Sequence, residues 1–177
     1  HVTVARVAEQ ACTRLEVLCL PDGSEQAAAD AGVLEAVVAA MQAHPQEAGV
    51  QMRGCMALFT VCCGEDAAGP GRRQRAAEAE VLEALVDALL AHPQAAALQV
   101  WGCMALTNVC CGDDAAAPAR KQQAAEAEAL EAVVAAMWAH PQVVGVQQEG
   151  CRALTNVCRG HDAAGLARKQ RAAQVGG

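Results

Sequence analysis

Apolar residues recur along the chain with the spacing of one-sided helices. In the segment 81–91 they fall at i, i+3, i+4 and i+7 and therefore share one helix face: Leu82, Leu85, Val86 and Leu89. Pro93 ends this helix, because proline disfavours the helical conformation of the residue before it. A longer apolar segment follows, and it predicts a second helix that runs to about Cys111.

A further type of segment is charged and rich in alanine. Gly112-Asp113-Asp114 breaks the preceding helix and supplies a carboxylate that can cap a new one. The new helix is expected to end near the Glu-Ala-Glu sequence at 126–128. The chain is thus predicted to repeat a unit of three helices, in which a charged helix is followed by an apolar helix and then by a longer one.

The sequence pattern returns at a fixed interval, which we call the repeat interval. Val33-Leu34-Glu35-Ala36 is matched at 81–84 and 129–132, while Ala-His-Pro-Gln begins at 43, 91 and 139. Gly-Cys-x-Ala-Leu begins at 54, 102 and 150. A fainter copy lies at 11–15, and its distance along the chain to 54–58 is slightly shorter than the repeat interval. Such internal repetition is typical of arrays in which each unit packs on its neighbours.

The interval predicts where each unit begins and ends. A single repeat domain spans 1–177, with the third helix of a partial unit at 1–20 and the first helix of a further unit at 161–177. Three complete units lie between them, at 21–64, 65–112 and 113–160. No capping repeat is visible at either end, so we expect the chain to be a segment of a longer array.

Two segments carry a resemblance to a known family. Ala105-Leu106-Thr107-Asn108-Val109 and its copy at 153–157 are similar to the Ala-Leu-x-Asn-Leu/Ile pattern in the third helix of armadillo repeats. The resemblance implies an all-α fold, a right-handed α-solenoid of stacked three-helix repeats with about 10–11 helices. Armadillo repeats are about 42 residues long. The repeat interval here is longer, and the additional residues fall around 67–71 and 115–119. HEAT repeats have two helices and would leave 72–80 unexplained.

Composition narrows the class of partner. The 177 residues are 54% hydrophobic but only 2% aromatic, which predicts a closely packed core of Ala, Val, Leu and Cys. The net charge of -7 argues against nucleic acid as a partner, because phosphate binding needs an excess of Lys and Arg. The longest uncharged stretch, 88–112, is interrupted by a His-Pro pair, so no membrane span is expected.

Eight of the ten cysteines form pairs seven residues apart, and each pair falls on one helix face: Cys12 and Cys19, Cys55 and Cys62, Cys103 and Cys110, Cys151 and Cys158. This pattern predicts small buried core residues, since zinc sites need four ligands on close loops. Reduced thiols in a helical core indicate a reducing intracellular compartment, either the cytosol or an organelle interior if a targeting segment precedes residue 1.

The resemblance also implies that the third helices line a concave groove. Stepping along these helices by three or four residues gives the expected partner-binding columns: Arg53, Met56, Thr60, Trp101, Met104, Asn108, Glu149, Arg152 and Asn156. An Asn amide offers a donor and an acceptor to an extended peptide. The alternative is that Asn108 and Asn156 bond the neighbouring repeat and that Trp101 packs on an adjacent helix or a partner chain. The tryptophan ladder of nuclear-import receptors is missing.

A row of cations also recurs at the repeat interval and predicts a basic ridge on the first helices: Arg72, Arg73, Arg75, Arg120, Lys121, Arg168, Lys169 and Arg171. Such a row is either a solvated face with pairs such as Arg75 and Glu78, or a docking surface for an acidic protein or lipid head group. The histidines of the His-Pro pairs are expected to meet free carbonyls at helix ends. For Trp138 the sequence does not decide between a contact with a partner and ordinary packing.

No arrangement of nucleophile, base, paired carboxylates or glycine-rich phosphate loop lies outside the repeat. We therefore expect no enzyme, no cofactor and no metal site. The sequence favours a protein-interaction scaffold that binds a peptide or partner chain on the concave third-helix surface. The alternative is an architectural accessory subunit, buried in a large multiprotein assembly, in which no peptide groove is in use.

Overall fold

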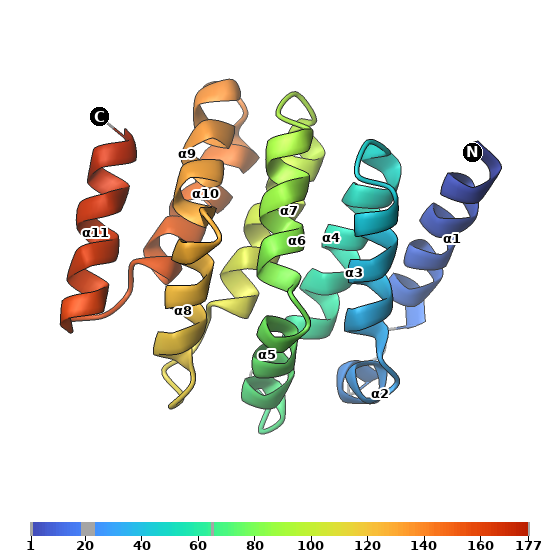
Figure 1. Cartoon of the computed structure of the whole chain (residues 1–177), viewed down its shortest axis with the longest axis horizontal. Helices are drawn as coiled ribbons and strands as arrows, with labels where there is room; N and C mark the ends of the chain where they lie inside the picture. The colour runs from blue at the N-terminus through green and yellow to red at the C-terminus, as the bar shows by residue number, and fades with distance from the viewer. Residues whose placement is uncertain (1, 19–23, 65, 177) are drawn as a thin grey trace.

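A computed structural model describes residues 2–18, 24–64 and 66–176, and in these residues it contains eleven helices and no strand (Figure 1). The prediction of an all-α fold is confirmed. The helices are α1 (Val2–Leu18), α2 (Ser24–Asp30), α3 (Val33–Ala43), α4 (Ala48–Cys62), α5 (Gly69–Glu78), α6 (Val81–Ala91), α7 (Ala96–Val109), α8 (Ala117–Glu126), α9 (Ala129–Ala139), α10 (Val144–Val157) and α11 (Ala163–Gly176).

The groups of helices follow one another in a single row. The bounds of α5, α6 and α7 return, one repeat interval later, as those of α8, α9 and α10. In Figure 1 the groups of helices lie side by side between α1 and α11, with α3, α6 and α9 in front of α4, α7 and α10. Neighbouring helices of the rear layer, α1 to α4, α4 to α7 and α7 to α10, pack directly on one another. Below, α5 and α8 are called first helices, α3, α6 and α9 second helices, and α4, α7 and α10 third helices.

The Gly-Cys motif lets each third helix approach its second helix closely. A Cβ atom added to Gly102 would lie 2.7 Å from Leu89 Cδ2, and one added to Gly54 would lie 2.5 Å from Met41 Sδ. Both distances are too short for a real contact, so a larger residue at either position would force the Leu89 or Met41 side chain to move. The cysteine that follows glycine is fully buried in both helices, at Cys55 and Cys103.

Each third helix ends against an arginine from the following helix. Arg120 of α8 donates from Nε to the carbonyl oxygen of Val109 (3.0 Å) and from a terminal nitrogen to that of Cys111 (3.1 Å). The guanidinium also pairs with Asp114 at 2.7 Å, and 1% of its side chain is exposed. Because the last carbonyls of a helix lack partners within it, the arginine serves as a cap. The equivalent bonds to the ends of α4 and α10 come from Arg72 and Arg168.

The predicted basic ridge is therefore wrong for most of its residues. Five of the eight cations are buried, namely Arg72, Arg73, Arg120, Lys121 and Arg168. Arg73 and Lys121 donate to the carbonyl oxygens of Gly64 and Gly112, in the loops that precede the first helices. These cations are held inside the protein because they satisfy backbone carbonyls, so they form neither a solvated face nor a docking surface.

The other three cations are also engaged by the protein. Arg75 pairs with Glu35 of the preceding unit at 3.0 Å, and the pair predicted with Glu78 is not made, since Gln74 donates to Glu78. At the equivalent positions in the last unit, Arg171 pairs with Glu131. Lys169 remains exposed and donates to the carbonyl oxygen of Gly160. The cations thus connect successive units.

Two further contacts recur at the ends of the second helices. Gln99 Nε2 donates to the carbonyl oxygens of Leu89 and His92, and the same arrangement is made by Gln51 and Gln147. His92 Nε2 lies 2.8 Å from the Pro45 carbonyl oxygen, and His140 Nε2 lies 2.8 Å from that of Pro93. The histidines do meet carbonyls, but these belong to the His-Pro turn of the preceding unit.

Removing a cap should destabilise the whole chain. Arg120→Ala is expected to lower the free energy of unfolding by about 3 kcal/mol, because it leaves Asp114 without its cation and two carbonyls without donors. Urea denaturation followed by circular dichroism measures this. Arg159→Ala removes the exposed pair with Asp113 and should change stability by less than about 1 kcal/mol. Equal losses in the two variants would contradict the capping role.

The same ion pair predicts acid sensitivity. The hydrogen bonds from Arg120 lower the pKa of Asp114 from 3.8 to about 2. A lowered pKa in the folded state stabilises the protein above the unfolded value, and this contribution is lost as pH falls from about 4 towards 2. The difference in unfolding free energy between wild type and Asp114→Asn should therefore shrink across this window. A difference that stays constant would argue against the pair.

Candidate functional site

The nine predicted partner-binding residues lie on three adjacent helices, α4, α7 and α10. We call them the third-helix surface. Eight of them are partly buried and Arg152 is exposed. Because the helices pack in register, residues one repeat interval apart form rows across the surface: Arg53, Trp101 and Glu149 in one row, Met56, Met104 and Arg152 in the next, Thr60, Asn108 and Asn156 in the third.

An aromatic pair stands at the centre of this surface. The ring centroids of Trp101 and Phe59 are 5.6 Å apart and the ring planes meet at 66°, an edge-to-face contact between α7 and α4. Both rings pack on the core but remain partly exposed. Met56 and Met104 are partly exposed on the same two helices. Phe59 is not among the predicted partner-binding residues, although it is the only Phe in the chain and immediately precedes Thr60.

The α10 side of the surface is charged. Arg152 and Glu149 form an exposed ion pair at 3.2 Å, one helical turn apart. Burial raises the pKa of the Cys103 thiol on α7 to about 12, and the negative charge of the Glu149 carboxylate adds a smaller rise. On α4, the Arg53 guanidinium donates to Met56 Sδ at 3.7 Å. The surface therefore combines an apolar centre with charges of both signs.

In the row of Thr60, Asn108 and Asn156, one side chain bonds the neighbouring repeat, as the alternative to peptide binding predicts. Asn108 Nδ2 donates to the carbonyl oxygen of Phe59 at 3.1 Å and so ties α7 to α4. Thr60 Oγ1 donates to Met56 in its own helix. Asn156 lines an open hollow of about 310 Å³ together with Cys151, Arg152 and Thr155. Asn108 has thus committed one of its amide donors to its neighbour, and Asn156 faces the open hollow.

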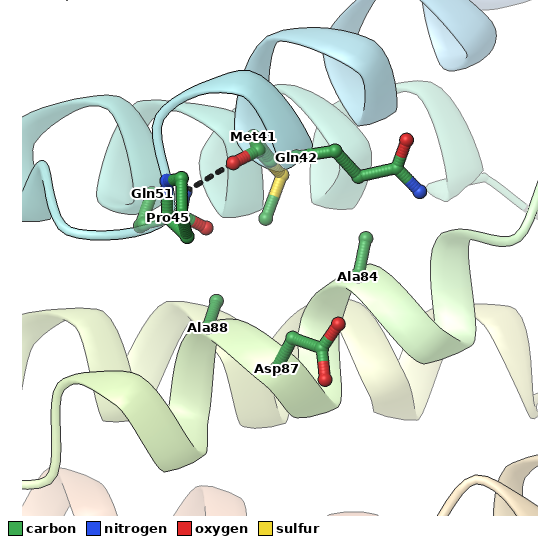
Figure 2. Close-up of a pocket in the computed structure, with 7 residues that line it drawn as sticks. All are labelled: Met41, Gln42, Pro45, Gln51, Ala84, Asp87 and Ala88. Atoms are coloured by element: carbon green, nitrogen blue, oxygen red, sulfur yellow. Dashed lines mark hydrogen bonds between the residues drawn. The ribbon is translucent and has the colours of Figure 1, made fainter.

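A small cavity lies between successive second helices. Met41, Gln42, Pro45 and Gln51 face Ala84, Asp87 and Ala88 across about 150 Å³ between α3 and α6 (Figure 2). The dashed line in Figure 2 marks the bond from Gln51 Nε2 to the Met41 carbonyl oxygen, 2.8 Å long. The facing residues on α6 are small, so the two helices come close and leave little space.

A larger cavity of about 520 Å³, which we call the α9–α11 cleft, is lined by Val134, Met137, Trp138, Pro141, Gln147, Leu154, Ala172 and Gly176. Trp138 is 69% exposed. The sequence left Trp138 open between packing and partner contact, and this exposure excludes a core role. Leu90, at the equivalent position on α6, is 49% exposed.

The cysteines are mostly buried thiols, as the sequence predicts. Burial raises the pKa of four of them to about 12, those of Cys55, Cys62, Cys103 and Cys110. Cys151 is exposed, so the prediction of burial is wrong at this position, and Cys19 lies outside the described residues. Within the described part of the chain, no group of three or more His, Cys, Asp or Glu could hold a metal ion.

Thiol reactivity should divide the cysteines by burial. With a pKa of about 12, only about one thiol in 10⁴ is ionised near pH 8, and the thiolate is the reactive form. Iodoacetamide should therefore modify the exposed Cys63 and Cys151 and spare the four buried thiols, as read by peptide mass spectrometry. In denaturant all should react. Rapid modification of Cys55 or Cys103 in the folded protein would contradict the described core.

Comparisons with known proteins leave the family open. No family model, no curated protein and no solved structure matches this chain. None of the helices in the described residues has both the length and the apolar character needed to cross a membrane.

Proposed function

We propose that the chain is an armadillo-like α-solenoid that acts as a protein-interaction scaffold and binds a peptide or partner chain on the third-helix surface. The regular recurrence of the three-helix unit supports the solenoid, as do the direct contacts between successive third helices. Units that stack in register give a continuous surface that a partner can follow over several helices.

The observation that carries the proposal is the aromatic and methionine centre of this surface. Trp101, Phe59, Met56 and Met104 lie partly exposed on two adjacent helices. Tryptophan is enriched among residues that dominate binding energy, and methionine adapts its shape to different partners. These side chains therefore keep apolar surface that a partner can cover.

The charges suggest what kind of segment fits. Glu149 and Arg152 already neutralise each other, so the surface has no strong preference for a highly charged ligand. An extended segment with one large apolar side chain could place it against Trp101 and Met104. Its flanking polar groups would then meet the ion pair on α10 and the amide of Asn156.

The architectural alternative also has an observation in its favour. Leu90 and Trp138 are exposed on second helices and lie outside the third-helix surface. Large exposed apolar side chains that recur at equivalent positions suit contacts within an assembly. The two surfaces share no residue, so substitutions in one can be tested without changing the other.

Selection of peptides from a random phage-displayed library tests the groove. Peptides enriched on the wild-type chain should bind the double variant Trp101→Ala, Met104→Ala at least about tenfold more weakly, because the apolar centre is lost. Fluorescence anisotropy with labelled peptides measures this, and circular dichroism checks that helicity is retained. Leu90→Ala is the matched control outside the surface. Equal binding to both variants would eliminate the groove and leave the architectural role.

A further inference from the structure

The arginine caps of the third helices differ in their charge partners. Arg72 and Arg120 each donate to both oxygens of an aspartate six residues earlier, Asp66 and Asp114. Arg168 is equally buried, with 3% of its surface exposed, but its hydrogen bonds go to neutral oxygens, two carbonyls at the end of α10 and the amide of Gln122. Among the described residues it therefore lacks the carboxylate that its two counterparts have.

The start of α11 explains the missing pair. Leu166 stands where α5 and α8 have proline, and its backbone N–H donates to the carbonyl oxygen of Asp162 at 3.0 Å. Proline could not donate this bond, so α11 begins earlier in its unit than α5 and α8 do. Asp162 lies six residues before Arg168 but accepts a backbone N–H of α11 at 2.9 Å, and in the described chain it makes no ion pair with Arg168.

Arg168 lines a hollow of about 210 Å³ that we call the α8–α11 hollow. One wall comes from α8 and the loop before it, the other from the loop before α11, so the hollow is a junction between two successive units. Lys121 of α8 also lines it and is 4% exposed. An ammonium has three donors, and within the described residues that of Lys121 makes one hydrogen bond, to the carbonyl oxygen of Gly112.

The charges around this hollow are not balanced. Besides His161, its ionisable lining consists of three cations and two carboxylates: Lys121, Arg159, Arg168, Asp113 and Asp162. Arg159 lies 3.4 Å from Asp113 and so offsets its charge. Lys169 adds a further cation, because it donates to the carbonyl oxygen of Gly160 in the wall. Buried cations without an anion are costly, so the hollow is suited to a negatively charged ligand.

Two helix N-termini add to the positive potential. Pro118, in the first turn of α8, lines the hollow, and so does Asp162, which directly precedes α11. The N-terminal end of a helix dipole favours anions. Pockets for organic ligands typically have about 300 Å³ or more. The smaller volume here, about 210 Å³, therefore suits a single anionic group and not the face of another protein.

We propose that the α8–α11 hollow binds a phosphate group, either free orthophosphate or a phosphate ester. Lys121 and Arg159 would donate to it from opposite walls, and its charge would offset that of Arg168. A phosphate dianion matches the excess of cations and offers several acceptor oxygens to ammonium and guanidinium donors. This site shares no residue with the third-helix surface and does not depend on the function proposed for it.

Phosphate should stabilise the unaltered chain. When chloride is replaced by phosphate at constant ionic strength, the midpoint of thermal unfolding should rise and saturate, by about 3 °C at a concentration tenfold above Kd. Calorimetric titration with sodium phosphate should give one site per chain. An effect that does not saturate, or that equals that of chloride, overturns the proposal.

A substitution in the wall tests the location of the site. Lys121→Gln removes the charge but keeps an amide donor, and it should weaken phosphate binding at least about tenfold. The matched control is Arg6→Gln, which makes the same change in net charge on an exposed side chain of α1, at the other end of the row from α11 (Figure 1). The control should bind phosphate as the wild type does.

A swap of two side chains on α8 tests the role of the unpaired arginine without a loss of stability. Gln122 accepts from Arg168 and donates to Glu126. Gln122→Glu combined with Glu126→Gln keeps the net charge and a hydrogen bond between the two positions, but gives Arg168 a carboxylate. The swap should raise the midpoint of unfolding in the absence of phosphate and weaken phosphate binding at least about tenfold. Affinity equal to that of wild type in the swap, or in folded Lys121→Gln, overturns the proposal.

Titration with O-phosphoserine distinguishes the two sources of phosphate. Tighter binding of O-phosphoserine than of orthophosphate would identify a phosphate ester, such as a modified side chain, as the ligand. Tighter binding of orthophosphate would identify the free ion. Either result supports the site, whereas binding of neither overturns it.

Discussion

The stacking of this chain depends on how helix ends are satisfied inside it. Every third helix ends where another helix begins, so its last carbonyls are shielded from water and need donors from the protein. Arg120 supplies them for α7 from a side chain that is almost wholly buried, and Asp114 offsets its charge. A buried guanidinium is costly unless it is paired and hydrogen-bonded, and here both conditions are met. The cap therefore fixes the direction in which the next helix leaves.

Hydrogen bonds to carbonyl groups at helix ends also fix the positions of the second helices, and hence the surfaces that the helices form. Gln99 satisfies the end of α6 from α7, while His140 reaches back to Pro93 in the preceding turn. Because these contacts recur at the repeat interval, every unit is placed on the preceding unit in the same way. Rows such as Arg53, Trp101 and Glu149 follow directly from that register. The third-helix surface is thus a consequence of the way in which the helix ends are hydrogen-bonded.

Much of this architecture could be predicted from sequence, since helical periodicity and His-Pro or Gly-Asp breaks depend only on local chemistry. The role of Arg72 and Arg120 could not, because a charged residue on a short helix has the same pattern whether it faces water or a neighbouring carbonyl. The aspartate six residues before each arginine, Asp66 and Asp114, was the available signal. Gln51 and Gln99 also recur at the repeat interval, but an isolated glutamine suggests no partner until the fold supplies one. The exposure of Trp138 likewise depends on what packs over α9.

The two tryptophans can contribute to binding in different ways. Trp101 already shares part of its surface with Phe59 and the core, so a partner can cover only the part that remains exposed and must also fit the shape around it. Trp138 is 69% exposed, and covering the remaining surface of such a side chain is worth up to about 3 kcal/mol by apolar area alone. Leaving that area in water brings no benefit to folding. Trp138 thus has more apolar surface left to cover than Trp101, whereas the mixed charges beside Trp101 are better suited to selecting among partners.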